Sequence, residues 1–223
     1  MAEAPAARDH DVRYANLAVR GTLLDDIVTR QVPVAAGMAP DLVSLCAAGN
    51  DLLRPGADPE ALARPLDDAV VALRATGVDV VLFTGFDTRA TPLLRLIGRR
   101  LAAMNDHVRR IARAHGAYLV DLWVMEPLAD PRARADDRLH LNAEGHRRVA
   151  ARTCEVLGVP TPDPAGDWRT PWPPAASTSW THRRADDLHW AREHLVPWVG
   201  RRLEGRSTGD GRPPKRPEPT PVV

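Results

Sequence analysis

This chain of 223 residues has few cysteines, no long apolar run and no recognisable signal peptide, and each of these absences argues against a class of protein. Only two cysteines are present, Cys46 and Cys154, and both lie in apolar runs, which predicts buried free thiols rather than a disulfide framework. No apolar run approaches the length of about 20 residues that a membrane-spanning helix needs. The first ten residues, MAEAPAARDH, lack the apolar core of a signal peptide, so we expect a cytoplasmic protein if residue 1 is the true start.

The chain also lacks an excess of charge of either sign, because its formal net charge is +1 at pH 7. Proteins that bind nucleic acid or anionic membranes usually carry a strong positive balance, so the composition predicts neither partner. No glycine-rich phosphate loop follows an apolar run, which argues against a flavodoxin-like binder of a nucleotide or cofactor. With 44% hydrophobic residues, the chain can form one domain with its own core.

Short apolar runs alternate with amphipathic runs over most of the chain. We interpret the apolar runs as strands and the amphipathic runs as helices. The predicted strands are residues 11–19, 41–49, 78–85 and 117–123, and the predicted helices are residues 22–33, 58–77, 91–116 and 142–158. The alternation predicts an α/β domain over residues 1–158, with a parallel sheet covered by helices on both faces.

The composition changes after the last of these helices. Residues 159–203 begin with a connector rich in Pro and Trp and continue into a helical pattern. We expect this C-terminal helix to pack back on the domain, with Trp190, Leu195 and Trp198 as its buried face. Residues 204–223 are rich in Gly, Pro and charge, which predicts a disordered tail.

Three loops at the ends of predicted strands carry glycine or polar residues: NLAVRG (16–21), AAGND (47–51) and DDRLH (136–140). In a parallel sheet such loops meet at one rim, where ligands bind. The N–H of Gly21, at a helix start, and the amide of Asn50 could stabilise an oxyanion. Asp137, three residues before His140, could fix the imidazole tautomer and leave Nε2 as a base.

Each of these loops has an ordinary structural alternative. A Gly-Asn-Asp sequence is usually a turn, and an Asp-x-x-His sequence is usually surface polarity. Three such loops in this order, each at a strand end, are harder to attribute to chance, so we favour a catalytic site. Asp136 is an alternative partner for His140, but the spacing of three residues favours Asp137.

The segments NLAVRG, AAGND and DRLHLNAEGH resemble the second, third and fifth sequence blocks of the SGNH (GDSL-type) hydrolases, in the same order and spacing. The resemblance covers about residues 12–158. It implies a flavodoxin-like three-layer α/β/α fold, a small-molecule ester, thioester or related acyl substrate, and neither a metal nor a cofactor. It implies that Gly21 and Asn50 form the oxyanion hole, and that Asp137 and His140 belong to a Ser-His-Asp triad.

The sequence lacks the first block of that family, the Gly-Asp-Ser that places the nucleophile at the end of the first strand. The four serines of the chain are Ser44, Ser177, Ser179 and Ser207. None follows a predicted strand, and Ser44 lies inside one that we expect to be buried. The first strand is central in a flavodoxin-like sheet, so its absence predicts a vacant slot of about 4.8 Å between the runs 11–19 and 41–47.

Two interpretations of this departure stay open. In the first, the sequence is a truncated gene model whose missing part carries the serine strand, and the retention of Asn50, Asp137 and His140 favours this interpretation. In the second, the protein is a non-catalytic descendant that binds acyl groups, glycans or a partner protein. An upstream reading frame that encodes a strand ending in Gly-Asp-Ser would decide for the first, and stop codons there would decide for the second. The acyl group and the oligomeric state stay unknown.

Overall fold

The computed structural model of the chain describes residues 12–88, 96–161, 167–174, 179–204, 207 and 209–222. Three parallel strands form its central sheet, in the order β2 (Leu42–Leu45), β3 (Asp79–Phe83) and β4 (Tyr118–Val120). They coincide with three of the predicted strands. The middle strand, β3, is buried over Val80, Val81 and Leu82, as its continuous apolar sequence predicts.

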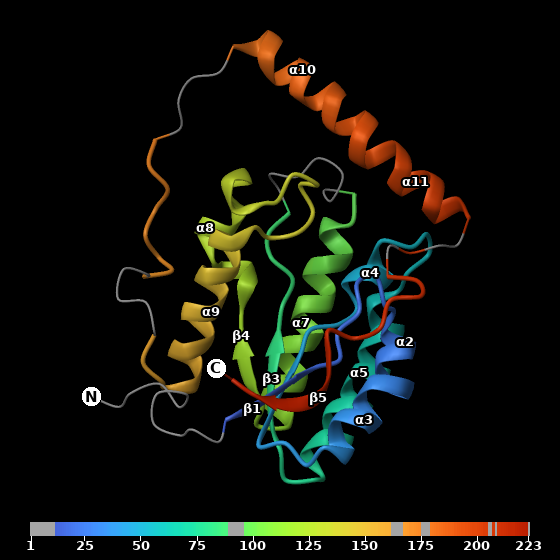
Figure 1. The fold of residues 1–223 in the computed structure, drawn as a ribbon, viewed down its shortest axis with the longest axis vertical. Coiled ribbons are helices and arrows are strands. Elements are labelled where there is room, and N and C mark those ends of the chain that lie inside the picture. The colour runs from blue at the N-terminus through green and yellow to red at the C-terminus, as the bar shows by residue number, and fades with distance from the viewer. Residues whose placement is uncertain are drawn as a thin grey trace.

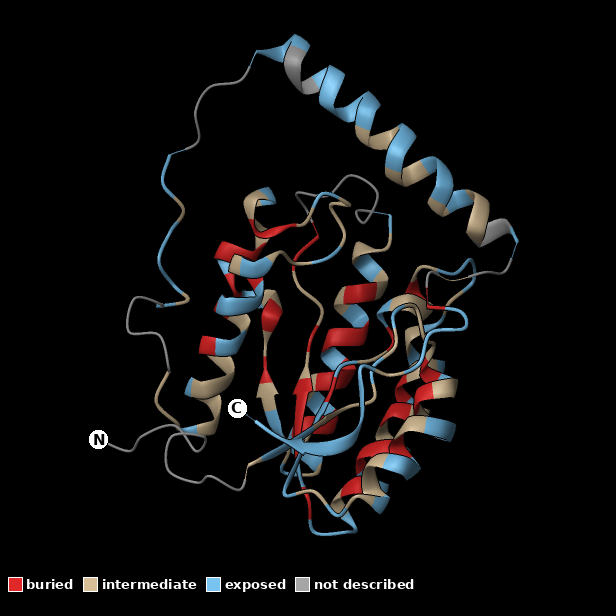
Figure 2. Cartoon of the chain, in the orientation of Figure 1, coloured by how far each residue is buried: buried red, intermediate tan, exposed pale blue. Residues whose placement is uncertain are grey.

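Helices cover both faces of this sheet (Figure 1). One face carries a continuous helical segment and two longer helices: α2 (Leu24–Asp26), η1 (Ile27–Gln31), α3 (Val32–Gly37), α5 (Pro59–Arg74) and α7 (Gly98–Ala114). The other face carries η2 (Leu122–Val124), α8 (Glu126–Ala129), η3 (Pro131–Ala133) and α9 (Ala143–Leu157). Buried residues lie where these layers meet (Figure 2), so the predicted three-layer α/β/α arrangement is confirmed.

The helix ends follow the capping residues in the sequence. Asp58 accepts a hydrogen bond from the N–H of Glu60 (3.1 Å) at the start of α5. Asn142 accepts one from the N–H of Gly145 (3.0 Å) at the start of α9, and Gly158 ends that helix with a positive φ of +69°. Both predicted caps and the predicted glycine stop are confirmed.

The N-terminal strand β1 (Arg13–Asn16) lies outside the central sheet and pairs antiparallel with β5 (Arg216–Pro221). The prediction of a disordered tail is therefore wrong over β5. Alternate residues of β5 are prolines, which cannot donate a backbone hydrogen bond. The residue directly after β5 does donate one, from the N–H of Val222 to the carbonyl of Val12 (3.0 Å). The tail thus satisfies backbone groups of β1 that the central sheet leaves unpaired.

Strand β2 lies at one edge of the central sheet, and no described strand pairs with its outer side. Leu42 is 44% exposed, and Ser44 and Cys46 on the same face of the strand are exposed too. The prediction that Ser44 and Cys46 are buried is wrong, because the helices on that face cover β3 and β4 but not β2. Cys154 is half-buried rather than buried. Both cysteines are free thiols, as predicted.

The C-terminal segments α10 (Trp180–Trp190), η4 (Ala191–Leu195) and α11 (Val196–Leu203) follow one another as a long helix that crosses one end of the domain (Figure 1). Trp190, Leu195 and Trp198 are half-buried rather than buried. The contact to the domain is partly polar, because Arg138 pairs with Asp187 (2.6 Å) and lies over the ring of Trp190. No helix within the described ranges is long and apolar enough to cross a membrane.

Candidate active site

Gly21 lies in the loop that leads from β1 to α2 and has a positive φ of +79°. A Cβ atom on this residue would lie 1.8 Å from Oγ of Ser207, which reaches the loop from the C-terminal tail. The left-handed backbone conformation favours glycine here, and a larger residue would also require the hydroxyl of Ser207 to move.

Replacement of Gly21 by alanine is expected to lower the free energy of unfolding by about 1–2 kcal/mol, because a Cβ is strained in left-handed backbone. The matched control is Gly37→Ala at the end of α3, where no atom lies within 4 Å of the new Cβ. That change is expected to alter the free energy of unfolding by less than about 1 kcal/mol. Urea unfolding measures both, and equal stabilities of the two variants would contradict the prediction.

The predicted oxyanion residues lie in loops that are tied to each other. Asn50, in the short helix α4 (Gly49–Leu52), donates from Nδ2 to the carbonyl of Thr22 (3.0 Å). Its neighbour Asp51 accepts a hydrogen bond from the N–H of Leu24 (3.1 Å) and so caps the start of α2. The structure therefore brings the loops of Gly21 and Asn50 together.

The predicted carboxylate–imidazole pair forms within one turn. Oδ2 of Asp137 lies 2.6 Å from Nδ1 of His140, and Oδ1 accepts hydrogen bonds from the N–H groups of Leu139 and His140, both at 3.0 Å. The turn places Arg138 in left-handed backbone, with a φ of +56°. Asp137, and not Asp136, is thus the partner of His140.

The environment of Asp137 has two opposing effects on its pKa. Burial raises the pKa, while the hydrogen bonds from the backbone and ring of His140 and from the N–H of Leu139 lower it further than burial raises it. The net pKa lies below the ordinary value. The carboxylate is therefore charged at neutral pH and is able to orient the imidazole.

This lowered pKa predicts how the turn responds to acid. The turn gains stability from the charged carboxylate above the ordinary pKa of about 3.9, and loses it as the pH falls through the lower pKa of the folded state. In an NMR titration, the amide signals of Leu139 and His140 are expected to move in one step below about pH 3.9. Asp137→Asn is expected to remove that step, and a midpoint above pH 4 in the unsubstituted chain would refute the prediction.

Arg20, which lies directly before Gly21, joins the turn to the Gly21 loop. Its Nη2 atom lies 2.9 Å from Oδ2 of Asp137 and 2.7 Å from Nδ1 of His140, and its Nε atom lies 3.4 Å from Nε2 of His140. The guanidinium thus contacts both nitrogens of the ring. The only sequence signal for this contact was a positive charge directly before Gly21.

Asn142 fixes the turn to the rest of the domain. Besides capping α9, its Nδ2 atom donates to the carbonyls of Arg132 (2.8 Å) and Arg134 (3.1 Å). The backbone N–H of Ala135 donates to the carbonyl of His140 (2.9 Å). The base of the turn is therefore held by the same residue that starts the helix.

Neither Ser44 nor Ser207 forms a hydrogen bond with the imidazole of His140. Ser44 lies within β2 and faces solvent. Ser207 donates from Oγ to the carbonyl of Arg20 (3.3 Å) and accepts a hydrogen bond from the N–H of Gly209 (3.2 Å). Ser177 lies outside the described residues. Within the part of the chain that the structure covers, no three His, Cys, Asp or Glu side chains are grouped to hold a metal ion.

Comparison with known proteins matches residues 1–148 to the GDSL-like lipase/acylhydrolase family. The structure is similar to that of LAE5, an alpha/beta hydrolase enzyme from the metagenome of Lake Arreo, Spain, with 25% identity, a TM-score of 0.54, and coverage of 62% of this chain and 69% of that chain. It is also similar to Axe2, an acetylxylan esterase from Geobacillus stearothermophilus, with 22% identity, a TM-score of 0.55, and coverage of 63% and 69%. No curated protein gave a significant match.

Proposed function

The chain belongs to the GDSL-like lipase/acylhydrolase family, whose match spans residues 1–148, and from this membership we propose that its rim of loops serves the hydrolysis of acyl esters by a serine mechanism. The observation that carries the proposal is the convergence of three loops. Arg20 and Thr22, which flank Gly21, contact the Asp137–His140 pair and Asn50, respectively.

Each group has a role that its position supports. His140 is the base that takes the proton from the nucleophile and returns it to the leaving alcohol, and Asp137 orients its ring. The N–H of Gly21 and the amide of Asn50 hold the oxyanion, and removal of one such donor typically lowers the rate by about 10²- to 10³-fold. The bond from Asn50 to the carbonyl of Thr22 keeps this amide against the Gly21 loop.

We further propose that residues 1–223 lack the nucleophilic serine of this mechanism. In support, Ser44 lies in mid-strand on the exposed face of β2, and the hydroxyl of Ser207 bonds to a backbone carbonyl rather than to an imidazole. A serine next to the outer edge of β2, at its carboxyl end, would face the rim that carries His140.

Catalytic mutants of the acetylxylan esterase support the choice of Asp137 and His140. Solved structures of its catalytic mutants replace a serine, an aspartate, or a histidine three residues after that aspartate. Asp137 and His140 have the same spacing in this chain. A short acyl group such as acetyl is therefore the first substrate to test.

A second candidate function is the non-catalytic binding of acyl groups, glycans or a protein partner. The contact of Arg20 with the ring of His140 favours it, because Nε of Arg20 lies 3.4 Å from Nε2, the nitrogen that a triad needs as its base. The same contact is compatible with catalysis if an entering serine strand displaces the guanidinium.

The deciding experiment supplies the missing strand. An N-terminal extension that provides a strand ending in Gly-Asp-Ser is fused to residues 1–223, so that it can pair in parallel with β2. We expect this strand-completed chain to hydrolyse 4-nitrophenyl acetate, while residues 1–223 alone give little or no turnover. The control extension carries Ala in place of the Ser. If hydrogen exchange shows that both extensions protect the amides of β2, yet both give the same rate, the hydrolase proposal fails.

A further inference from the structure

A hollow of about 790 Å³ opens beside the Gly21 loop. Its walls come from that loop, from the start of the following helical segment, from the turn after α4, and from the tail segment before β5. The charged side chains that line it are Arg20, Arg30, Arg54, Arg212, Asp26 and Asp210. Four guanidinium groups against two carboxylates give the hollow a positive balance.

Most of these charges are already compensated inside the protein. Arg20 pairs with Asp137 (2.9 Å), and Arg30 pairs with Asp26 (3.3 Å). Asp210 accepts a hydrogen bond from the backbone N–H of Ser207 (2.7 Å).

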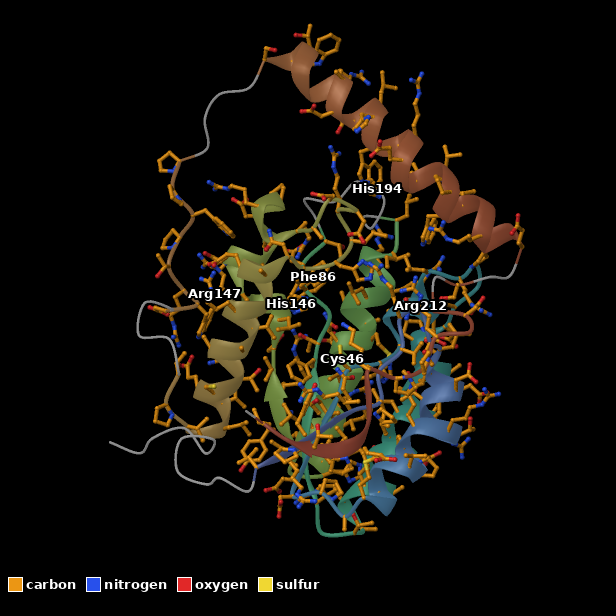
Figure 3. All side chains as sticks on the ribbon, in the orientation of Figure 1. Cys46, Phe86, His146, Arg147, His194 and Arg212 are labelled. Atoms are coloured by element: carbon orange, nitrogen blue, oxygen red, sulfur yellow. The ribbon has the colours of Figure 1, made fainter. Side chains whose placement is uncertain are left out.

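Arg54 and Arg212 differ from the other arginines of the hollow. Among the described residues, neither side chain forms an ion pair, a hydrogen bond or a ring contact. Arg54 lies in the turn after α4, while Arg212, which is labelled in Figure 3, lies in the tail segment. Two uncompensated cations from separate segments therefore line the same hollow.

The position of Arg212 depends on long-range contacts of the tail. Ser207 bonds to the carbonyl of Arg20, and a Cβ on Gly209 would lie 1.8 Å from that same carbonyl oxygen. The tail is then held at its far end by the pairing of β5 with β1. The tail segment is thus packed against the Gly21 loop at one end and paired with β1 at the other.

We propose that this hollow binds a carboxylate on the substrate, so that the protein acts on anionic acyl esters. The inference rests on the proposed function, because the N–H of Gly21 would hold the ester carbonyl at one side of the hollow. Arg54 and Arg212 would then bind the carboxylate, for which the planar guanidinium is the best matched side chain. Screening by salt weakens such a contact, since it lies close to solvent.

The test compares two methyl esters of similar shape, monomethyl succinate, which carries a carboxylate, and dimethyl succinate, which is neutral. Binding to residues 1–223 is measured by NMR titration at low and high NaCl. The chain is expected to bind the anionic ester about 10-fold more tightly than the neutral ester, as expected for a charge-assisted contact. High NaCl is expected to remove that difference.

The variant Arg54→Gln/Arg212→Gln is expected to lose this preference without changing the binding of the neutral ester. Its matched control is Arg99→Gln/Arg113→Gln, which removes the same charge from two exposed positions on α7 that do not line the hollow. Equal binding of the two esters by the unsubstituted chain would overturn the proposal without any variant. An equal loss in the two double variants would overturn it as well.

The strand-completed chain separates this inference from the proposed function. Hydrolysis of both esters with the same kcat/KM would refute the anionic preference and leave the hydrolase proposal intact. Selective binding of monomethyl succinate without hydrolysis of either ester would support the anion site and refute the hydrolase proposal.

Discussion

Replacement of His140 by alanine in the strand-completed chain is expected to lower kcat for 4-nitrophenyl acetate by about 10⁶-fold. The imidazole is the base that makes the serine nucleophilic, and a serine without it is nearly as inert as no serine at all. The measurement is initial rates at saturating substrate, with the folded state of the variant checked by thermal unfolding. In residues 1–223 alone, the same substitution is expected to leave the already low rate unchanged.

Two further substitutions are expected to lower kcat by smaller factors. Asp137→Asn keeps the shape of the turn but no longer favours the correct tautomer, and is expected to lower kcat by about 10⁴-fold. Asn50→Ala removes one oxyanion donor and is expected to lower it by about 10²- to 10³-fold. Turnover by residues 1–223 that survives Ser44→Ala and disappears with His140→Ala would show that another nucleophile is present.

The largest effect on stability is expected for Leu82→Ala, with a loss of about 3–4 kcal/mol in the free energy of unfolding. Leu82 is fully buried in the middle strand of the sheet and belongs to the core cluster beneath α5 and α7. Strand and helices on all sides prevent the site from collapsing around the deleted carbons, so a cavity remains. Such a loss is a large part of the about 5–15 kcal/mol that stabilises a typical domain.

Leu96→Ala is the matched control for this substitution, because it deletes the same atoms from a side chain that is 80% exposed. Its expected effect is below about 0.5 kcal/mol. Guanidinium unfolding of the two variants measures the difference. If Leu82→Ala cost no more than the control, the packing of the central strand would be looser than its burial indicates.

Local sequence signals predicted the parts of the fold that depend on neighbouring residues. The apolar run of β3 and the caps Asp58 and Asn142 were found because burial and helix starts follow from short-range patterns. The strand β5 was missed, since its prolines argue against a strand in isolation and only β1 gives it a partner. The exposure of Ser44 and Cys46 was missed for a related reason, because the sequence of an apolar strand does not reveal whether helices cover both of its faces.

In the candidate site, too, contacts between residues close in sequence could be predicted, and contacts between distant residues could not. Asp137 and His140 are three residues apart, so their contact could be predicted from the spacing. The contact of Arg20 with His140 spans 120 positions, and that of Ser207 with Arg20 spans 187, so no local pattern indicates either one. The family resemblance placed Gly21 and Asn50 at one rim, but it did not indicate that Arg20 contacts the imidazole there.

The ladder between β1 and β5 has a consequence for synthesis on the ribosome. Its two halves lie near opposite ends of the chain, and Arg13 is paired with Pro221. Translation proceeds from the N-terminus at roughly 5–20 residues per second, and early parts of a domain can fold while later parts are still being made. This ladder forms later, since β5 is synthesised only after the central sheet and the helices that cover it. The growing chain therefore carries an unpaired first strand until β5 has emerged, and a chaperone that binds extended segments would find it there.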